Sequence, residues 1–241
     1  MKKLMIAVSA AALCGAVFAV ESANIVGYAG SDLRDAGSTL TSALFQNVGS
    51  ADGSIRLGDV VPVAAEGVDL VGNLEIQYLN YFGGTDWDND YIWDGEVWLK
   101  DGDSDASDVI IPVGQGLWVG NSAGAPVNFR SSGEVNQKDI QFPLREVGST
   151  AAANAFPTAT TFGKIVPVAA EDVDLVGNLE IQYLNYFGGT DWDNDYIWDG
   201  EVWLKDGDSD ASEIVVAAGQ GLWVGNSAGA PVTLHIAAPE L

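Results

Sequence analysis

The sequence predicts an all-β protein built from two tandem, near-identical domains, each a β-sandwich or a partly open β-barrel. Two observations lead to this fold class. The second half of the chain repeats the first, so one architecture has to serve both halves. Within each half the apolar residues alternate with period two or form short runs between Gly, Asp, Asn and Pro, which is typical of strands joined by tight turns.

The duplication is strictest at its centre. Residues 68–107 return without change at 173–212. The longer segment 60–127 matches 165–232 at an offset of 105 and differs only at positions 60, 67 and 108–113. Any surface formed by the identical residues is therefore expected to occur twice.

The repeat also extends toward the N-terminus. Residues 33–39 read LRDAGST and are echoed by LREVGST at 144–150, an offset of 111. The larger offset indicates a loop insertion in the first copy, around 49–54. We expect two domains of ordinary size, at 20–133 and 134–241.

Six strands are predicted in each repeat. In the first copy they cover 60–64, 74–82, 91–99, 109–113, 117–119 and 127–129. Trp118 and its counterpart Trp223 lie in apolar Leu-Trp-Val runs between glycines, and we assign both to the core.

The dipeptide Asp94-Gly95 lies between β-rich flanks and favours a two-residue type I′ hairpin turn, which pairs Trp93 with Glu96. Alternation then separates an aliphatic face from an aromatic face. The aliphatic face holds Ile92, Val97 and Leu99, and the aromatic face holds Tyr91, Trp93 and Trp98. We expect the aliphatic face to meet the core. The aromatic face is either a second packed layer or an exposed platform.

Residues 1–19 have the pattern of a secretory signal peptide: two lysines, an apolar run, and small residues before a cleavage point after Ala19. Leu13 precedes the single cysteine, Cys14, which disfavours the alternative of a lipoprotein anchor. No later stretch is long enough to span a membrane. We expect an exported protein, secreted or held at the cell surface, without a disulfide.

The chain is strongly acidic, with a formal charge of −24. Cleavage would remove Lys2 and Lys3, leaving 8 basic against 34 acidic residues and a charge of −26. This balance excludes nucleic acid as a partner.

In several sequence motifs the chain resembles a loosely defined group of secreted bacterial β-repeat proteins, of the kind found in Verrucomicrobia and Lentisphaerae. These motifs are the segment ESANIVGY at 21–28, Asn-Ala-Phe-Pro at 154–157, and Gly-Gln-Gly-Leu-Trp-Val at 114–119 and 219–224. The first copy departs from them, with Ala-Leu-Phe-Gln at 43–46. The resemblance implies an exported surface or matrix-type protein and supplies no catalytic residues.

Acidic runs of the form D-x-D-x-D are the candidate metal ligands, because alternate aspartates in a tight loop can converge on Ca²⁺, which takes six to eight oxygens. The spacing is not that of an EF-hand. In the first repeat the runs are Asp86, Asp88, Asp90 and Asp101, Asp103, Asp105, to which Asp94 and Asp108 would add ligands. The second repeat supplies Asp191, Asp193, Asp195, Asp199, Asp206, Asp208 and Asp210. The alternative is an acidic, solvated hairpin without an ion.

A planar row of aromatic side chains could stack on sugar rings. The candidate ligand-binding residues are Tyr91, Trp93 and Trp98, repeated as Tyr196, Trp198 and Trp203. The alternative is that these aromatics only pack within the sheet.

The function expected from the sequence is that of a secreted, non-enzymatic structural or interaction protein of the cell surface or matrix, stabilised by calcium and self-associating. The alternative is an extracellular carbohydrate-binding module. The single histidine, His235, occurs only in the second repeat and is expected to be a paired or edge residue rather than a base. The expected partners are a second copy of the chain or a cell-surface polysaccharide, and residues 24–28 are the expected strand donor for self-association.

Overall fold

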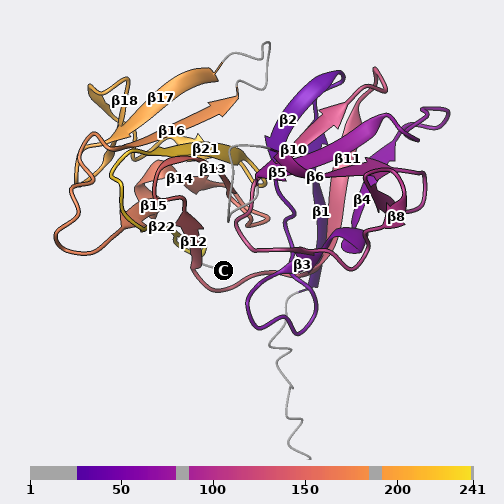
Figure 1. Cartoon of the computed structure of the whole chain (residues 1–241), viewed down its shortest axis with the longest axis horizontal. Helices are drawn as coiled ribbons and strands as arrows, with labels where there is room; N and C mark the ends of the chain where they lie inside the picture. The colour runs from indigo at the N-terminus through magenta and orange to yellow at the C-terminus, as the bar shows by residue number, and fades with distance from the viewer. Residues whose placement is uncertain (1–25, 80–86, 185–191, 240–241) are drawn as a thin grey trace, which may run out of the picture.

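The computed structural model describes residues 26–79, 87–184 and 192–239 of the 241-residue chain. These residues form an almost entirely β structure, interrupted only by two short 3-10 helices. Two halves lie side by side (Figure 1), and neither contains a closed barrel within the described ranges. The predicted all-β class is confirmed, in its sandwich form.

In its described residues, the first repeat has eleven strands and one 3-10 helix. They are β1 (Val26–Leu33), β2 (Gly37–Thr41), β3 (Ile55–Arg56), η1 (Leu57–Asp59), β4 (Val60–Ala64), β5 (Leu74–Leu79), β6 (Trp87–Trp93), β7 (Trp98–Lys100), β8 (Ser104–Asp105), β9 (Ile110–Ile111), β10 (Leu117–Asn121) and β11 (Val127–Glu134).

The second repeat contributes the same series. It comprises β12 (Ile140–Leu144), β13 (Gly148–Ala153), β14 (Thr160–Thr161), η2 (Phe162–Lys164), β15 (Ile165–Val168), β16 (Leu179–Leu184), β17 (Trp192–Trp198), β18 (Trp203–Lys205), β19 (Ser209–Asp210), β20 (Val215–Val216), β21 (Gly221–Asn226) and β22 (Val232–Ile236).

The described residues of each repeat fold into a three-stranded and a six-stranded antiparallel sheet. The first repeat has the orders β1-β11-β4 and β2-β10-β5-β6-β7-β8. The second has the equivalent orders β12-β22-β15 and β13-β21-β16-β17-β18-β19. Two-stranded pairs, β3-β9 and β14-β20, complete the two halves. The described strand order is thus the same in both repeats.

The core of each repeat lies between its two sheets. In the first repeat Phe129 of the smaller sheet packs edge-on against Trp98 of the larger one, with ring centroids 6.2 Å apart. Leu33 and Val60 of the small sheet join Ile76 of the large sheet in the same buried cluster. Apolar burial between facing sheets is the dominant stabilising contribution in such a sandwich.

The predicted hairpin turn is wrong in length. Trp93 pairs with Trp98 rather than with Glu96, so the connection has four residues, 94–97. The Asp94 carboxylate accepts the backbone N–H groups of Glu96 and Val97, both at 2.8 Å, and these bonds hold the longer loop closed. Because strand side chains have period two, a register shift of two keeps the same residues on each face.

The expectation that the aliphatic face meets the core is also wrong. Tyr91, Trp93 and Trp98 are 2%, 6% and 0% exposed, whereas Ile92 and Leu99 are only half-buried. The indole N–H of Trp98 donates to the Val60 carbonyl at 2.8 Å, across the sandwich. A large ring therefore fills the space between the sheets without leaving its polar group unpaired.

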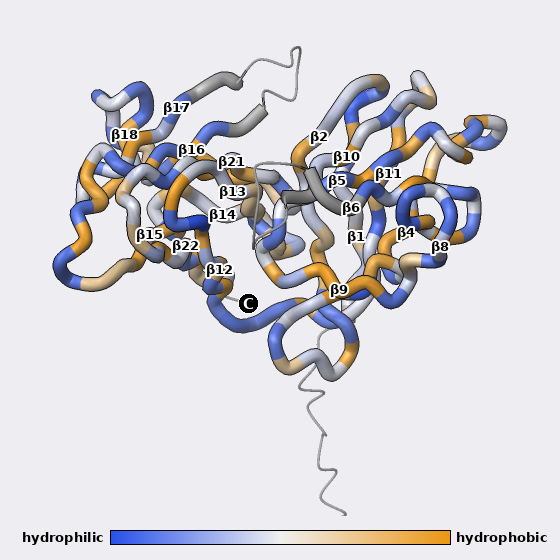
Figure 2. The backbone as a smooth tube through the Cα atoms, viewed as in Figure 1, coloured by the Kyte–Doolittle hydropathy of each residue, from blue (hydrophilic) through white to orange (hydrophobic). Residues whose placement is uncertain are grey.

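Hydrophobic and hydrophilic segments alternate along the strands of both halves (Figure 2). The connection leading into β12 is hydrophilic for several consecutive residues, 136–139, and it joins the two repeats. Across the described ranges, no helix has the length and apolar character needed to cross a bilayer.

Candidate functional sites: the acidic hairpins and the inter-repeat junction

The described part of the first acidic run lies in a strand in each repeat. Asp86 and Asp191 lie outside the described residues, as do the side chains of Asp88 and Asp193. The described remainder of the first run belongs to β6, an extended strand. Alternate α-carbons of a strand lie about 6.6 Å apart, so such residues follow a line rather than surround a point.

The second run does turn sharply. Asp101 has φ of 52°, a left-handed conformation that is uncommon for residues other than glycine, and its counterpart Asp206 has the same value. The Asp101 N–H donates to the Asp90 carbonyl at 2.9 Å, which places members of the two runs next to each other. The same bond, at 2.8 Å, joins Asp206 to Asp195.

Several of the candidate carboxylates already hold backbone groups. Asp94 and Asp199 each accept two N–H groups of their own hairpin loop. These bonds, first that from Val97 and then that from Glu96, lower the pKa of Asp94 below its usual value. Hydrogen bonds from the side chain and backbone of Ser107 likewise lower the pKa of Asp105.

The remaining described acidic residues are dispersed. Asp103 and Asp208 are exposed. Asp108 is exposed and lies 3.8 Å from a guanidinium nitrogen of Arg56, a contact that contributes little in water. Within the described ranges, no three or more His, Cys, Asp or Glu residues are placed to hold one metal ion. The calcium site stays a prediction.

We expect Asp94→Ala to destabilise the first repeat more than Asp94→Asn, because asparagine retains an oxygen for the two N–H groups. Asp103→Ala, in the same acidic region, is the control, and in EDTA, where no calcium is bound, it should have no effect. Since the folded-state pKa of Asp94 is lowered, its stabilising effect is present above the unfolded-state pKa and is lost as the pH falls through the folded value. Urea unfolding should therefore show a deficit for Asp94→Ala at neutral pH that shrinks on acidification, and a deficit independent of pH would contradict this role.

The aromatic residues proposed as a sugar platform are not exposed. All six lie in the buried clusters of the two sandwiches: Tyr91, Trp93, Trp98, Tyr196, Trp198 and Trp203. Trp93 and Trp98 pack edge-to-face at 5.2 Å, and Trp198 and Trp203 repeat this contact at 5.3 Å. These aromatic residues therefore pack within the sandwich, as the alternative interpretation states. The prediction of an exposed sugar-binding platform is wrong.

The two repeats meet through a junction that the sequence did not reveal. Thr41 forms an antiparallel bridge with Gln220, and Gln115 forms one with Ala152. At the sequence offset of 111 the counterpart of Thr41 in the second repeat is Ala152. At the offset of 105 the counterpart of Gln115 is Gln220. Each bridge is therefore the image of the other, and the repeats are related by an approximate two-fold axis, as in an isologous dimer interface.

Equivalent residues also meet each other at this junction. The rings of Trp118 and Trp223 lie edge-to-face with centroids 6.5 Å apart. Leu40 and its counterpart Ala151 are buried in one small cluster with these two rings. Both tryptophans are half-buried, so their assignment to the repeat cores is corrected to the junction.

Glycines allow the two backbones to approach. A Cβ built on Gly221 would lie 2.2 Å from Leu40 Cγ and 2.7 Å from the Leu40 carbonyl oxygen. A Cβ on the equivalent Gly116 would lie 2.7 Å from the Ala152 carbonyl oxygen. The Gly116 N–H donates to the Ala151 carbonyl at 2.9 Å. The Gly-Gln-Gly run thus serves contact between repeats.

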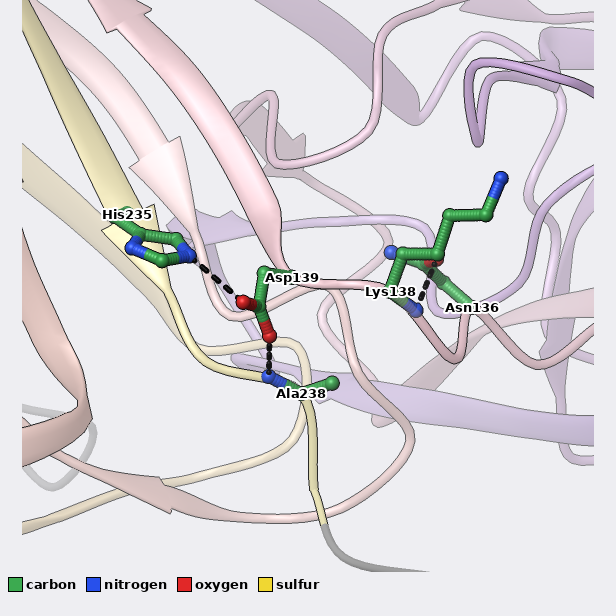
Figure 3. A network of polar contacts seen from close by, with 5 residues as sticks. All are labelled: Asn136, Lys138, Asp139, His235 and Ala238. Carbon is green, nitrogen blue, oxygen red and sulfur yellow. Dashed lines mark hydrogen bonds and ion pairs between the residues drawn. The ribbon is translucent and has the colours of Figure 1, made fainter.

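The connection between the repeats is tied to the end of the chain (Figure 3). Asp139 accepts the Ala238 N–H at 2.8 Å and lies 3.0 Å from Nε2 of His235. The bond from Ala238, and then that from His235, lowers the pKa of Asp139. Asn136 accepts the Lys138 N–H at 3.1 Å. The single histidine therefore joins β22 to the inter-repeat connection.

The expected strand donor is already paired within the chain. Residues 24–25 lie outside the described residues, and β1 pairs with β11 from Val26 to Leu33. Comparison with protein-family models, curated proteins and solved structures gives no match for this chain. The resemblance to secreted β-repeat proteins stays a prediction.

Proposed function

We propose that the protein is an exported, non-enzymatic structural or interaction protein whose two sandwiches act as one rigid unit at the cell surface or in an extracellular matrix. The observation that carries this proposal is the isologous junction between the repeats. Paired bridges and the Trp118–Trp223 contact restrict relative motion of the two halves. A rigid, strongly acidic unit with the same architecture in both halves suits a repeated role in an assembly better than a single catalytic centre.

The edges of the sheets support a specific mode of self-association. The edge strands β8 and β19 have only two residues and carry aspartates, and β4 contains Pro62, a pattern that blocks strand addition. Among the described edge strands, β1 is the longest and has no proline. In this proposal a second copy of the chain pairs with the free side of β1.

The test is light scattering of the chain after removal of the signal peptide, over a range of protein concentrations in low and high NaCl. We expect the mean mass to rise with concentration, and more steeply in high salt, which screens the net negative charge. Tyr28→Glu adds a charge to β1 and should reduce association, whereas Val176→Glu, equally charged and on a surface loop, should not. A monomer at every concentration and salt would contradict self-association.

Calcium stabilisation belongs to the same proposal and rests on charge density. The segment 86–108 carries nine acidic residues and one lysine. Like charges a few ångströms apart cost about 1 kcal/mol per pair in water, and a cation bound only to the folded state would offset this. At tenfold saturation such a site adds about 1.4 kcal/mol to the free energy of unfolding.

Thermal unfolding in EDTA, in millimolar CaCl₂ and in NaCl of matched ionic strength separates a site from general screening. We expect calcium to raise the midpoint beyond the matched salt, and Asp103→Asn with Asp208→Asn to reduce the difference. An equal unfolding midpoint in both salts would show that the aspartates lie in solvated hairpins without a bound ion, which is the alternative to a calcium site.

A further inference from the structure

The two-fold relation between the repeats is not exact beside the junction, and one of the differences involves Ser31. On one side Phe142 of β12 faces Gly114, and its Cβ lies 3.4 Å from a Cβ built on that glycine. On the other side Ser31 of β1 faces Gly219, the counterpart of Gly114, with a corresponding distance of 3.3 Å. The offset of 111 makes Ser31 the equivalent of Phe142. A hydroxymethyl group thus occupies the place of a benzyl group.

The position is less buried where serine replaces phenylalanine. Phe142 is 3% exposed and Ile140 is fully buried, whereas the equivalent Ser31 and Ala29 are only half-buried. Leu44 occupies the inner part of the space beside Gly219, at 3.2 Å from the same built Cβ. A hollow of about 490 Å³ lies beside Ser31 and Gly219, which is within the usual size of a small-molecule site.

Three segments of the chain line the hollow. Its walls are residues 30–32 of β1, residues 39–41 of β2, and residues 217–220 of the second repeat. Leu40, Ala217 and Ala218 make it largely apolar. Among the described residues that line the hollow, Asp32 is the only charged one, so an anionic ligand is disfavoured.

Two hydroxyl groups of the lining, those of Ser31 and Thr41, contact each other. The Thr41 hydroxyl donates to the Gly219 carbonyl at 3.0 Å, and a hydroxyl has a single hydrogen. The Ser31 hydroxyl lies 2.6 Å from the Thr41 hydroxyl, and the arrangement that also satisfies the Gly219 carbonyl has Ser31 as the donor in that contact. The Ser31 oxygen therefore retains an acceptor site and has no hydrogen to offer a ligand.

We propose that this hollow is a binding site for one small, uncharged aromatic molecule that carries a hydrogen-bond donor, of the phenol class. The ring is suggested by Phe142, the equivalent of Ser31 in the second repeat, which buries a phenyl group beside the counterpart of Gly219. The Ser31 oxygen identifies the donor. This site is present once per chain, since the second repeat fills its own image, and it does not depend on the proposed structural role.

The experiment uses the full chain, with p-cresol and 4-methylanisole as probes, followed by the amide NMR signals of residues 39–41 and 217–220. The two probes share a ring and differ in the donor. We expect p-cresol to bind saturably with a Kd of about 1 mM, typical for a ligand of this size. We expect 4-methylanisole to bind about fivefold more weakly, the effect of one neutral hydrogen bond.

Two variants locate the site. Ser31→Ala removes the acceptor and should make the two probes bind equally, and Ser31→Phe fills the hollow and should abolish binding of both. Val61→Phe, which adds a ring at an exposed position of β4, should change neither. The proposal is overturned if p-cresol shifts no signals of these residues, if both probes bind the unaltered chain equally, or if Ser31→Phe binds like the unaltered chain. Should Ser31→Phe fail to fold, the Ser31→Ala comparison decides alone.

Discussion

Replacement of Trp98 by alanine is expected to lower the free energy of unfolding of the first repeat by about 3–5 kcal/mol. The side chain is fully buried, packs against Trp93 and Phe129, and satisfies the Val60 carbonyl. Truncation leaves a large cavity and an unpaired buried carbonyl. Trp203→Ala should have a similar effect in the second repeat, where the indole donates to Ile165.

Urea unfolding followed by far-UV circular dichroism measures this effect. Trp98→Phe keeps most of the ring and loses the donor, so it should cost less than alanine, about 1–3 kcal/mol for the unpaired carbonyl. Val71→Ala, at a side chain that is 55% exposed, is the control and should change stability by less than about 0.5 kcal/mol. If Trp98→Ala costs no more than this control, the aromatic face is not the core of the sandwich.

The second large effect is expected from Gly221→Ala at the junction. The added methyl group would overlap Leu40, including its backbone, and neither repeat can move without disturbing the Thr41–Gln220 bridge. Such overpacking costs about 1–3 kcal/mol.

Gly225→Ala is a matched control in the same strand, because a Cβ there would meet only the Glu180 carbonyl oxygen at 3.9 Å. We expect urea unfolding to show a lower midpoint for Gly221→Ala and an unchanged or higher one for Gly225→Ala. Equal behaviour of the two variants would mean that the repeats do not approach closely at Gly221.

The sequence predicted the strands whose apolar residues alternate clearly. The range 60–64 coincides with β4, and 117–119 and 127–129 are the first parts of β10 and β11. β2 and most of β1 were not predicted as strands, because glycine, serine and threonine interrupt their apolar pattern, and only the expected strand donor at 24–28 overlaps β1. Pairing with the continuous strands β11 and β10 makes them strands.

Other features depended on tertiary contacts that one sequence does not display. The faces of the hairpin were assigned correctly, but which face is buried depended on the width of the sandwich, which the indole of Trp98 spans to reach Val60. The junction was missed because its side chains look like core residues within one repeat. The signal was nevertheless present, since a Gly-Gln-Gly run kept in both copies permits close backbone contact.

The most direct test of the central claim, that the repeats dock through a two-fold junction, is disulfide trapping in a chain that carries Cys14→Ser. Residues opposite each other in an antiparallel bridge have α-carbons about 4.5–5.5 Å apart, within the range a disulfide accepts. Thr41→Cys with Gln220→Cys, and separately Gln115→Cys with Ala152→Cys, should each give an intrachain disulfide in the monomer on mild oxidation, detected by mass spectrometry of non-reduced peptides. Chains with only one of these cysteines provide the control for links between molecules. Intrachain disulfides in both pairs are the predicted result, and failure of both pairs to form in a folded monomer would contradict the junction.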